Sequence, residues 1–156
     1  MSYVLVVIDM QPYFSETAAS ILNNVCDVIK QAKEDDAFVL IVQYGGCGRS
    51  YNEIYDAVGH YTKWDIVTKE HDDGSLEIWD FFEADDISLE SEIRICGVNY
   101  QYCVKATAIG LLEMMPYAQI KILRSACNGP LDYDRASDFH RATKYYERNN
   151  MLIESE

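Results

Sequence analysis

Three side chains suited to acid–base or nucleophilic chemistry stand at or shortly after the ends of apolar runs: Asp9, Lys69 and Cys103. A cysteine attacks as its thiolate, and a carboxylate beside it can take the thiol proton and later return it to a leaving amine. An ammonium group can hold both anionic groups and balance their charge. Brought together, these groups could cleave an amide or a related C–N bond through a thioester.

Each of these residues also has an ordinary explanation when considered alone. An acid at a strand end is commonly a loop residue, a lysine there is commonly solvated, and a cysteine at an apolar helix start is commonly a small buried hydrophobe. A helical pattern follows Cys103, and a helix N-terminus and a nearby ammonium both favour a thiolate. The N–H groups at such a helix start could also stabilise an oxyanion, an effect of about 3 kcal/mol per donor.

The elements that would position these residues alternate between short apolar runs and longer helical patterns. The β-branched run 3–8 is typical of a strand buried on both faces. Further strands are expected at 37–42, 64–68, 92–98, 119–123 and, as a short edge strand, 151–154. Helices are expected after Ser15 or Thr17, after Cys103, and at 136–148.

This alternation predicts an α/β fold, a three-layer α/β/α sandwich of Rossmann-like type with a mostly parallel sheet of five to six strands. Such sheets bind ligands beyond the carboxyl ends of their strands. We therefore expect Asp9, Lys69 and Cys103 to lie at one edge of the sheet.

The composition narrows the possible partners. The chain of 156 residues is expected to form one domain, 1–156, and its 26 acidic and 13 basic side chains give a formal net charge of −13. This charge argues against a nucleic-acid partner and favours a neutral substrate over an anionic one. Five cysteines without regular spacing do not form a disulfide framework, and no apolar stretch approaches the ~20 residues of a membrane span. A cytoplasmic protein without a membrane partner is expected.

Two segments resemble the motifs of a known family. Residues 6–14, VVIDMQPYF, resemble the opening motif of the isochorismatase-like cysteine hydrolases, the group that includes nicotinamidases. Residues 97–108, GVNYQYCVKATA, resemble the nucleophile segment of that family. Residues 67–69 and 124–127 resemble its lysine segment and the loop after its fifth strand. The resemblance implies an isochorismatase-like hydrolase fold over most of the chain.

Carried over onto this sequence, the resemblance implies a catalytic triad. Asp9 would be the general base and acid, Lys69 the charged partner, and Cys103 the nucleophile. The resemblance also implies a cis peptide bond between Val98 and Asn99. The backbone N–H groups of Asn99 and Cys103 would then form the oxyanion hole.

Aromatic residues are expected to line the substrate pocket. Phe14 matches the aromatic residue that walls the pocket in the family, and Tyr44 and Trp64 are further candidates. Tyr100 stands in the nucleophile segment in place of a residue usual in the family, which would alter the pocket wall.

The sequence departs from nicotinamidases where they hold a metal. These enzymes have an Asp-x-His pattern after the second strand, whereas residues 43–49 here are QYGGCGR. We therefore expect no metal and no cofactor. The alternative is a metal site built from His60 and His71 with Asp65 or Asp72.

The sequence thus predicts a cysteine hydrolase that acts on a small amide or related C–N bond of a small-molecule substrate. Two alternatives remain open: an isochorismatase-like vinyl ether hydrolase, and a non-catalytic binding or regulatory relative. Relatives are commonly dimers or tetramers, so a homo-oligomer is expected.

Overall fold

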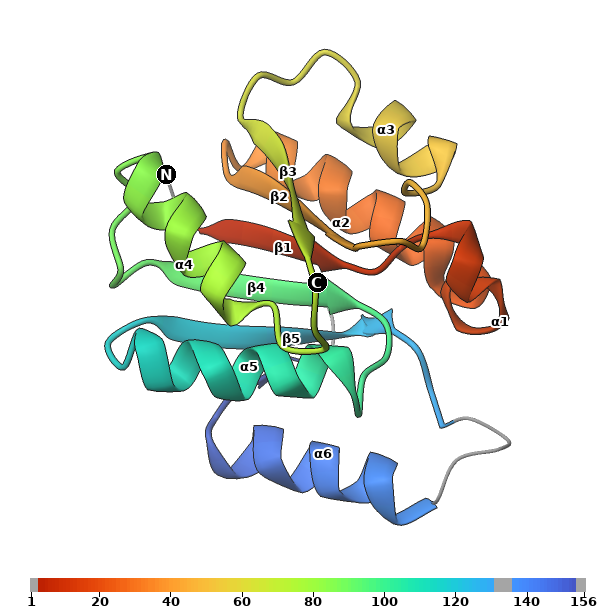
Figure 1. Cartoon of the computed structure of the whole chain (residues 1–156), viewed down its shortest axis with the longest axis vertical. Helices are drawn as coiled ribbons and strands as arrows, with labels where there is room; N and C mark the ends of the chain where they lie inside the picture. The colour runs from red at the N-terminus through yellow and green to blue at the C-terminus, as the bar shows by residue number, and fades with distance from the viewer. Residues whose placement is uncertain (1–2, 131–135, 154–156) are drawn as a thin grey trace.

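The computed structural model describes residues 3–130 and 136–153, and its centre is one parallel sheet (Figure 1). The strand order is β3-β2-β1-β4-β5-β6, and every pair of neighbours is parallel. The predicted α/β class with five to six mostly parallel strands is confirmed. The strands are β1 (Val4–Ile8), β2 (Phe38–Tyr44), β3 (Trp64–Lys69), β4 (Glu92–Gly97), β5 (Gln119–Cys127) and β6 (Leu152–Ile153).

Helices cover both faces of this sheet. The sequence predicted the helices after the first, fourth and fifth strands, but it did not predict α3 or α4. Helix α3 spans only seven residues, and α4 has a sequence, SLEIWDFFEA, in which apolar side chains are not confined to a narrow stripe. The helices are α1 (Ser15–Ala18), α2 (Leu22–Glu34), α3 (Asn52–Val58), α4 (Ser75–Ala84), α5 (Cys103–Met114) and α6 (Ala136–Arg148), with 3-10 turns η1 (Pro12–Phe14) and η2 (Ala19–Ile21).

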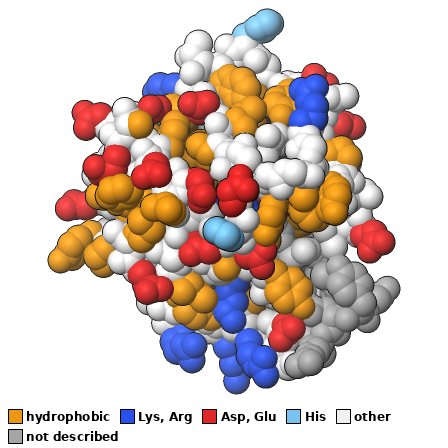
Figure 2. Space-filling model, in the orientation of Figure 1, with side chains coloured by type: hydrophobic (Ala, Val, Ile, Leu, Met, Phe, Trp, Pro, Cys, Tyr) orange, Lys and Arg blue, Asp and Glu red, His pale blue; other side chains and the backbone are white. Residues whose placement is uncertain are grey.

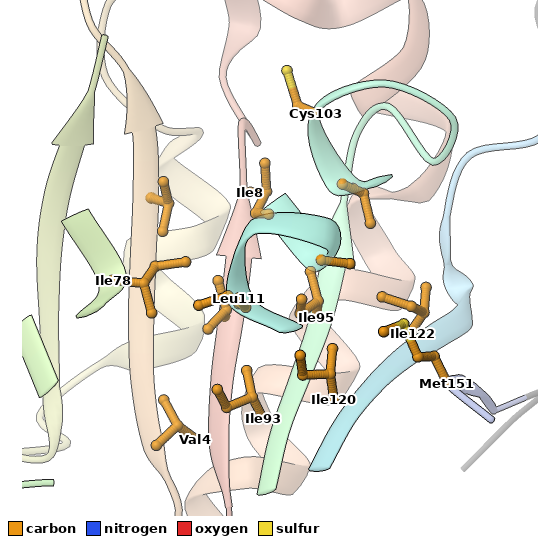
Figure 3. Close-up of a cluster of buried hydrophobic side chains, with 14 of the residues drawn as sticks. Val4, Ile8, Ile78, Ile93, Ile95, Cys103, Leu111, Ile120, Ile122 and Met151 are labelled. Atoms are coloured by element: carbon orange, nitrogen blue, oxygen red, sulfur yellow. The ribbon is translucent and has the colours of Figure 1, made fainter. Parts of the chain in front are cut away.

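The two faces of the sheet are separated by the alternation of side chains along each strand. In β1, Val4, Val6 and Ile8 belong to the apolar cluster that includes residues of α4, α5 and α6. Leu5 and Val7 belong to the cluster formed with α2 and α3. Figure 3 shows the first cluster, with side chains of the central strands packed against α4 and α5. The predicted three-layer arrangement is therefore present.

The chain order predicts a ligand-binding crevice at the centre of the sheet. From β1 the chain passes to β2 on one side, and it later returns to β4 on the other side of β1. The crevice lies where the connections from two neighbouring strands diverge. Here those strands are β1 and β4, which are followed by Asp9 and by the segment from Val98 to Cys103.

Close contact between β1 and β4 depends on Gly97. Its φ of +116° is unfavourable for residues with a side chain, and a Cβ at this position would lie 2.1 Å from the carbonyl oxygen of Ile8. The Val98 N–H donates to that same Ile8 oxygen at 3.1 Å. Glycine thus lets β4 end directly against β1.

The element boundaries differ from the sequence predictions in small ways. Strand β5 continues to Cys127 instead of ending at Leu123, and its pairing with β4 is irregular between Ile95 and Gly97. The expected edge strand is shorter, and Glu154 lies outside the described residues. Within 3–130 and 136–153, no helix is long and apolar enough to cross a membrane.

Candidate active site

Asp9 and Lys69 form a buried ion pair at the carboxyl edge of the sheet. Lys69 Nζ lies 3.3 Å from Asp9 Oδ2, and the two side chains are 0% and 2% exposed. Asp9 directly follows β1, and Lys69 ends β3, the strand that lies beyond β2. Asp9 Oδ1 has no hydrogen-bond partner in the part of the chain that the structure describes. Buried charges are costly unless they are paired, so this arrangement strongly restricts both side chains.

The remaining contacts of the Lys69 ammonium are also supplied by the protein. It donates to the carbonyl oxygens of His71 at 3.1 Å and Asp72 at 3.3 Å. The ring of Tyr44 covers it, with 3.9 Å between Nζ and the ring centroid, a distance that suits a cation–π contact. A Cβ on Gly74 would lie 2.9 Å from the Lys69 side chain, so glycine leaves room for it.

Cys103 is the first residue of α5 and adjoins this ion pair. Figure 3 shows it above Ile8 at one end of the apolar cluster, with its sulfur directed away from the aliphatic side chains. Its side chain is a hydrogen-bonding partner of Asp9, and this contact contributes to the pKa of both groups. The structure therefore brings the predicted set of Asp9, Lys69 and Cys103 together.

The electrostatics of the site differ from the expectation of a stabilised thiolate. Burial raises the pKa of Cys103, the charge of Asp9 raises it further, and Lys69 lowers it by less than these two effects combined. Burial also raises the pKa of Asp9 above its ordinary value, against the opposing influence of Lys69 and Cys103. Removal from water and the charge of Asp9 together outweigh the ammonium of Lys69, so the pKa of the thiol lies above its ordinary value. At rest the thiol keeps its proton.

The segment before Cys103 carries the cis peptide bond between Val98 and Asn99, as the family resemblance implied. The side chain of Asn128 holds this segment: its Nδ2 donates to Asn99 Oδ1 at 3.0 Å, and its Oδ1 accepts from the Tyr100 N–H at 3.0 Å. Within the described residues, no acceptor is found for the backbone N–H of Asn99 or Cys103. Neither N–H is therefore tied to a backbone acceptor in this part of the chain.

Two of the predicted pocket aromatics lie at this edge. The rings of Phe14 and Tyr44 are 6.3 Å apart, and Tyr44 covers Lys69. Phe14 and Asn99 line a common pocket of about 210 Å³ together with residues of the segment 13–17. Phe14 is thus close to the proposed oxyanion hole.

The other two predicted pocket aromatics lie elsewhere. Trp64 begins the six-residue strand β3, at the opposite end from Lys69, and it packs on Tyr55 with ring centroids 6.4 Å apart. Tyr100 is completely buried, its hydroxyl contacts Thr143, and its ring lies against α6. Residue type alone does not show which aromatic side chains line the pocket. That depends on which end of a strand carries the residue and on the direction in which its side chain points.

The alternative metal site is not assembled. His60 follows α3, whereas His71 lies in the loop after β3, and both side chains are exposed. Within residues 3–130 and 136–153, no group of three or more His, Cys, Asp or Glu side chains could hold a metal ion.

Gln11 has a positioning role that the sequence did not reveal. It is completely buried, its Nε2 donates to the carbonyl oxygens of Tyr44 at 3.2 Å and Gly48 at 2.8 Å, and its Oε1 accepts from the Tyr44 N–H at 2.9 Å. These bonds fix the backbone that places Tyr44 over Lys69. The signal in the sequence was a polar residue within the opening motif, which does not by itself identify a partner.

Comparisons with known proteins bear on the family and the fold of the chain. A family model described as the isochorismatase domain matches residues 3–114. No curated protein matches the chain.

Solved structures share the fold at low sequence identity. A MAR1 ribonuclease from Caenorhabditis elegans has a TM-score of 0.79 at 17% identity, covering 99% of this chain and 77% of that one. The nicotinamidase/pyrazinamidase PncA from Bacillus subtilis has a TM-score of 0.77 at 16% identity, covering 99% and 100%. The yeast nicotinamidase Pnc1p, bound to nicotinaldehyde, has a TM-score of 0.76 at 15% identity, also covering 99% and 100%.

Proposed function

Because this chain belongs to the isochorismatase family of hydrolases, we propose that it cleaves a small amide or related C–N bond through a thioester on Cys103. The observation that carries the proposal is the buried Asp9–Lys69 pair beside Cys103 at the crevice between β1 and β4. A base, a nucleophile and a compensating cation are the groups that such a reaction requires.

The first half of the reaction forms the thioester. Cys103 Sγ attacks the carbonyl carbon of the amide while its proton passes to the Asp9 carboxylate. The carbonyl oxygen becomes an oxyanion, which accepts hydrogen bonds from the N–H groups of Asn99 and Cys103. When this intermediate collapses, the C–N bond breaks, Asp9 returns the proton to the nitrogen, and ammonia or an amine leaves.

The second half restores the enzyme. Water attacks the thioester carbon and gives a proton to Asp9, and the tetrahedral intermediate then expels the Cys103 sulfur. The sulfur regains its proton from Asp9, and a carboxylic acid is released. Lys69 keeps Asp9 in place and offsets its charge in both halves.

The electrostatics fit this sequence of proton transfers. The raised pKa of Asp9 makes its carboxylate a stronger base than an exposed aspartate. Because the pKa of Cys103 is also raised, the thiol is neutral before substrate arrives. Attack and proton transfer to Asp9 therefore occur together.

A panel of small amides, nicotinamide included, tests the proposal through the release of ammonia, with and without added zinc, iron or manganese. Nicotinamide belongs in the panel because the similar solved structures include nicotinamidases. Wild type should release ammonia from at least one amide, and Cys103→Ala should lower the rate at least ~10³-fold. Cys26→Ala in α2, on the other face of the sheet, should retain the wild-type rate.

The alternatives give different results. Hydrolysis of a vinyl ether that persists in Cys103→Ala would identify the vinyl ether hydrolase. Absence of turnover on every amide and ether would favour a binding or regulatory relative. Undiminished ammonia release by Cys103→Ala would overturn the thioester mechanism.

We also propose that the chain acts on its small-molecule substrate as a homo-oligomer, a dimer or tetramer, in the cytoplasm. A structurally similar Escherichia coli protein, 14% identical with a TM-score of 0.76, is described as an octameric hydrolase; the alignment covers 99% of this chain and 75% of that one. All five cysteines here are free thiols, which suits a reducing compartment. Light scattering coupled to size-exclusion chromatography would measure the assembly.

A further inference from the structure

The mouth of this site is formed in part by an acidic loop, residues 70–74, between β3 and α4. Its side chains Glu70, His71, Asp72 and Asp73 are all exposed. Figure 2 shows acidic side chains gathered near the centre of the visible face around one histidine, where Figure 1 places this loop. The loop is also in direct contact with the buried ion pair, because two of its carbonyl oxygens accept hydrogen bonds from Lys69.

Asp72 is the member of this loop that is fixed beside the reacting groups. Its Oδ1 accepts a hydrogen bond from the Tyr44 hydroxyl at 3.1 Å, and the ring of the same tyrosine covers Lys69. Its carbonyl oxygen accepts from Lys69 at 3.3 Å and from the Thr107 hydroxyl of α5 at 3.4 Å. Both the backbone and the carboxylate of Asp72 are therefore tied to the site.

The other acids of the loop are placed differently. Asp73 Oδ1 accepts from the Ser75 N–H at the start of α4, and its carboxylate faces α5 at Gly110. The Glu70 carboxylate lies beside Gly45. Neither has the bond to Tyr44 that holds Asp72 over the site.

The charges around Cys103 leave an excess of negative charge. Lys69 is the cation that acts on Asp9 and Cys103, and its charge is already offset by Asp9 at 3.3 Å. The carboxylate of Asp72 is the further charge, and it raises the pKa values of Asp9, Tyr44 and Cys103. Among the described residues, the charges that act on Cys103 when Asp9 is ionised are two carboxylates, Asp9 and Asp72, and one ammonium, Lys69.

We propose that Asp72 is a specificity-determining residue that excludes anionic amides, so that the substrate is an uncharged or cationic amide. The negative group of an anionic substrate would have to approach Cys103 past the Asp72 carboxylate, which Tyr44 holds in place. The ammonium of Lys69 does not offset this repulsion, because it is already paired with Asp9. An uncharged amide meets no such repulsion, and a cationic one is attracted. This inference deepens the proposed amidase function, and the identification of the substrate as an amide rests on that function. The selection by charge can be measured at Cys103 without turnover.

Alkylation of Cys103 by iodoacetamide and iodoacetate provides that measurement. The two reagents have nearly the same shape and differ by one negative charge, and peptide mass mapping separates Cys103 from the other cysteines. The rate ratio, iodoacetate over iodoacetamide, is normalised to the same ratio for 2-mercaptoethanol. The fraction of thiolate affects both rates equally, so the ratio reports the electrostatic field alone.

Wild type should disfavour iodoacetate, and Asp72→Asn should raise the normalised ratio about three- to tenfold at low ionic strength, as expected for two unit charges several ångströms apart near a protein surface. Asp72→Lys should raise it further, and added salt should reduce each difference. The matched control is Asp56→Asn, which makes the same change in net charge on α3, across the sheet. An equal ratio in Asp72→Asn and Asp56→Asn overturns the proposal.

The kinetics of amide hydrolysis provide a second test of the proposal. For the amides that the enzyme hydrolyses, kcat/KM should be lower for an ω-carboxylate analogue, and Asp72→Asn should narrow this difference. If no amide is hydrolysed but the alkylation ratio responds to Asp72, the proposed reaction fails and the charge selection stands. If amides are hydrolysed and the ratio does not respond, the reaction stands and the role of Asp72 is wrong.

Discussion

The ammonium of Lys69 lies 3.3 Å from Asp9 Oδ2 in a pair that water does not reach, whereas Lys63 and Asp36 form a shorter pair, 2.7 Å, on the surface. The longer, buried pair has the larger effect on stability. When a surface ion pair is broken, water hydrates both charges. When a buried charge loses its partner, no water is present to solvate it.

Lys69→Met should therefore destabilise the protein by about 3–5 kcal/mol at neutral pH, because it leaves the Asp9 carboxylate buried without a cation. Lys63→Met, which removes an exposed ammonium, should change the free energy of unfolding far less. Urea unfolding of both variants at one pH would measure the difference. Equal effects of the two substitutions would contradict the importance assigned to burial.

The raised pKa of Asp9 predicts a specific dependence of stability on pH. A carboxyl whose pKa is higher in the folded state binds more protons there than in the unfolded state once the pH exceeds 3.8, its ordinary pKa. The contribution of Asp9 to stability is thus fully present below that pH and is lost as the pH rises through the folded-state pKa. The difference in unfolding free energy between wild type and Asp9→Asn should fall over this window and then level off. A difference that increases with pH would show that the pKa is lowered.

Asp9→Asn should have opposite effects on the rate at which Cys103 is alkylated and on the rate of turnover. The charge and hydrogen bond of Asp9 both raise the pKa of the thiol, and Lys69 lowers it. Removing the Asp9 charge should increase the fraction of thiolate, so iodoacetamide should label Cys103 faster at neutral pH than in wild type. Turnover should nevertheless fall about 10²- to 10⁴-fold, because no base remains to return the proton to the leaving nitrogen. Slower labelling would mean that Asp9 activates the resting thiol.

Gly97→Ala should disrupt the junction of β1 and β4. The new Cβ would lie 2.1 Å from the Ile8 carbonyl oxygen at a φ of +116°, so the strands must separate or the backbone must change conformation. We expect a loss of more than about 2 kcal/mol in the free energy of unfolding, together with loss of activity. Gly129→Ala is the control, since nothing lies within 4 Å of a Cβ there. Similar stability of the two variants would contradict this account.

Much of the fold could be predicted because it depends on local patterns. The apolar run before Asp9 and the β-branched runs that follow it mark strands buried on both faces, and the helix that begins at Cys103 has an apolar composition typical of a buried helix. Helices α3 and α4 could not be predicted in the same way, because one is short and the other has apolar side chains on several faces. Their contacts with the sheet and with neighbouring helices stabilise them more than their own periodicity does.

The sequence alone therefore determined which residues could carry out the chemistry and that Asp9, Lys69 and Cys103 would lie at or after the ends of strands of a parallel sheet. Only the tertiary structure decided that Lys69 pairs with Asp9 beneath the ring of Tyr44, which Gln11 holds in place, because these contacts join residues far apart in the sequence. It also decided that the side chains of Trp64 and Tyr100 pack elsewhere, on Tyr55 and on α6. Residue type fixes what a side chain can do, but its protonation and access to substrate depend on burial and neighbouring charge, which exist only once the chain has folded.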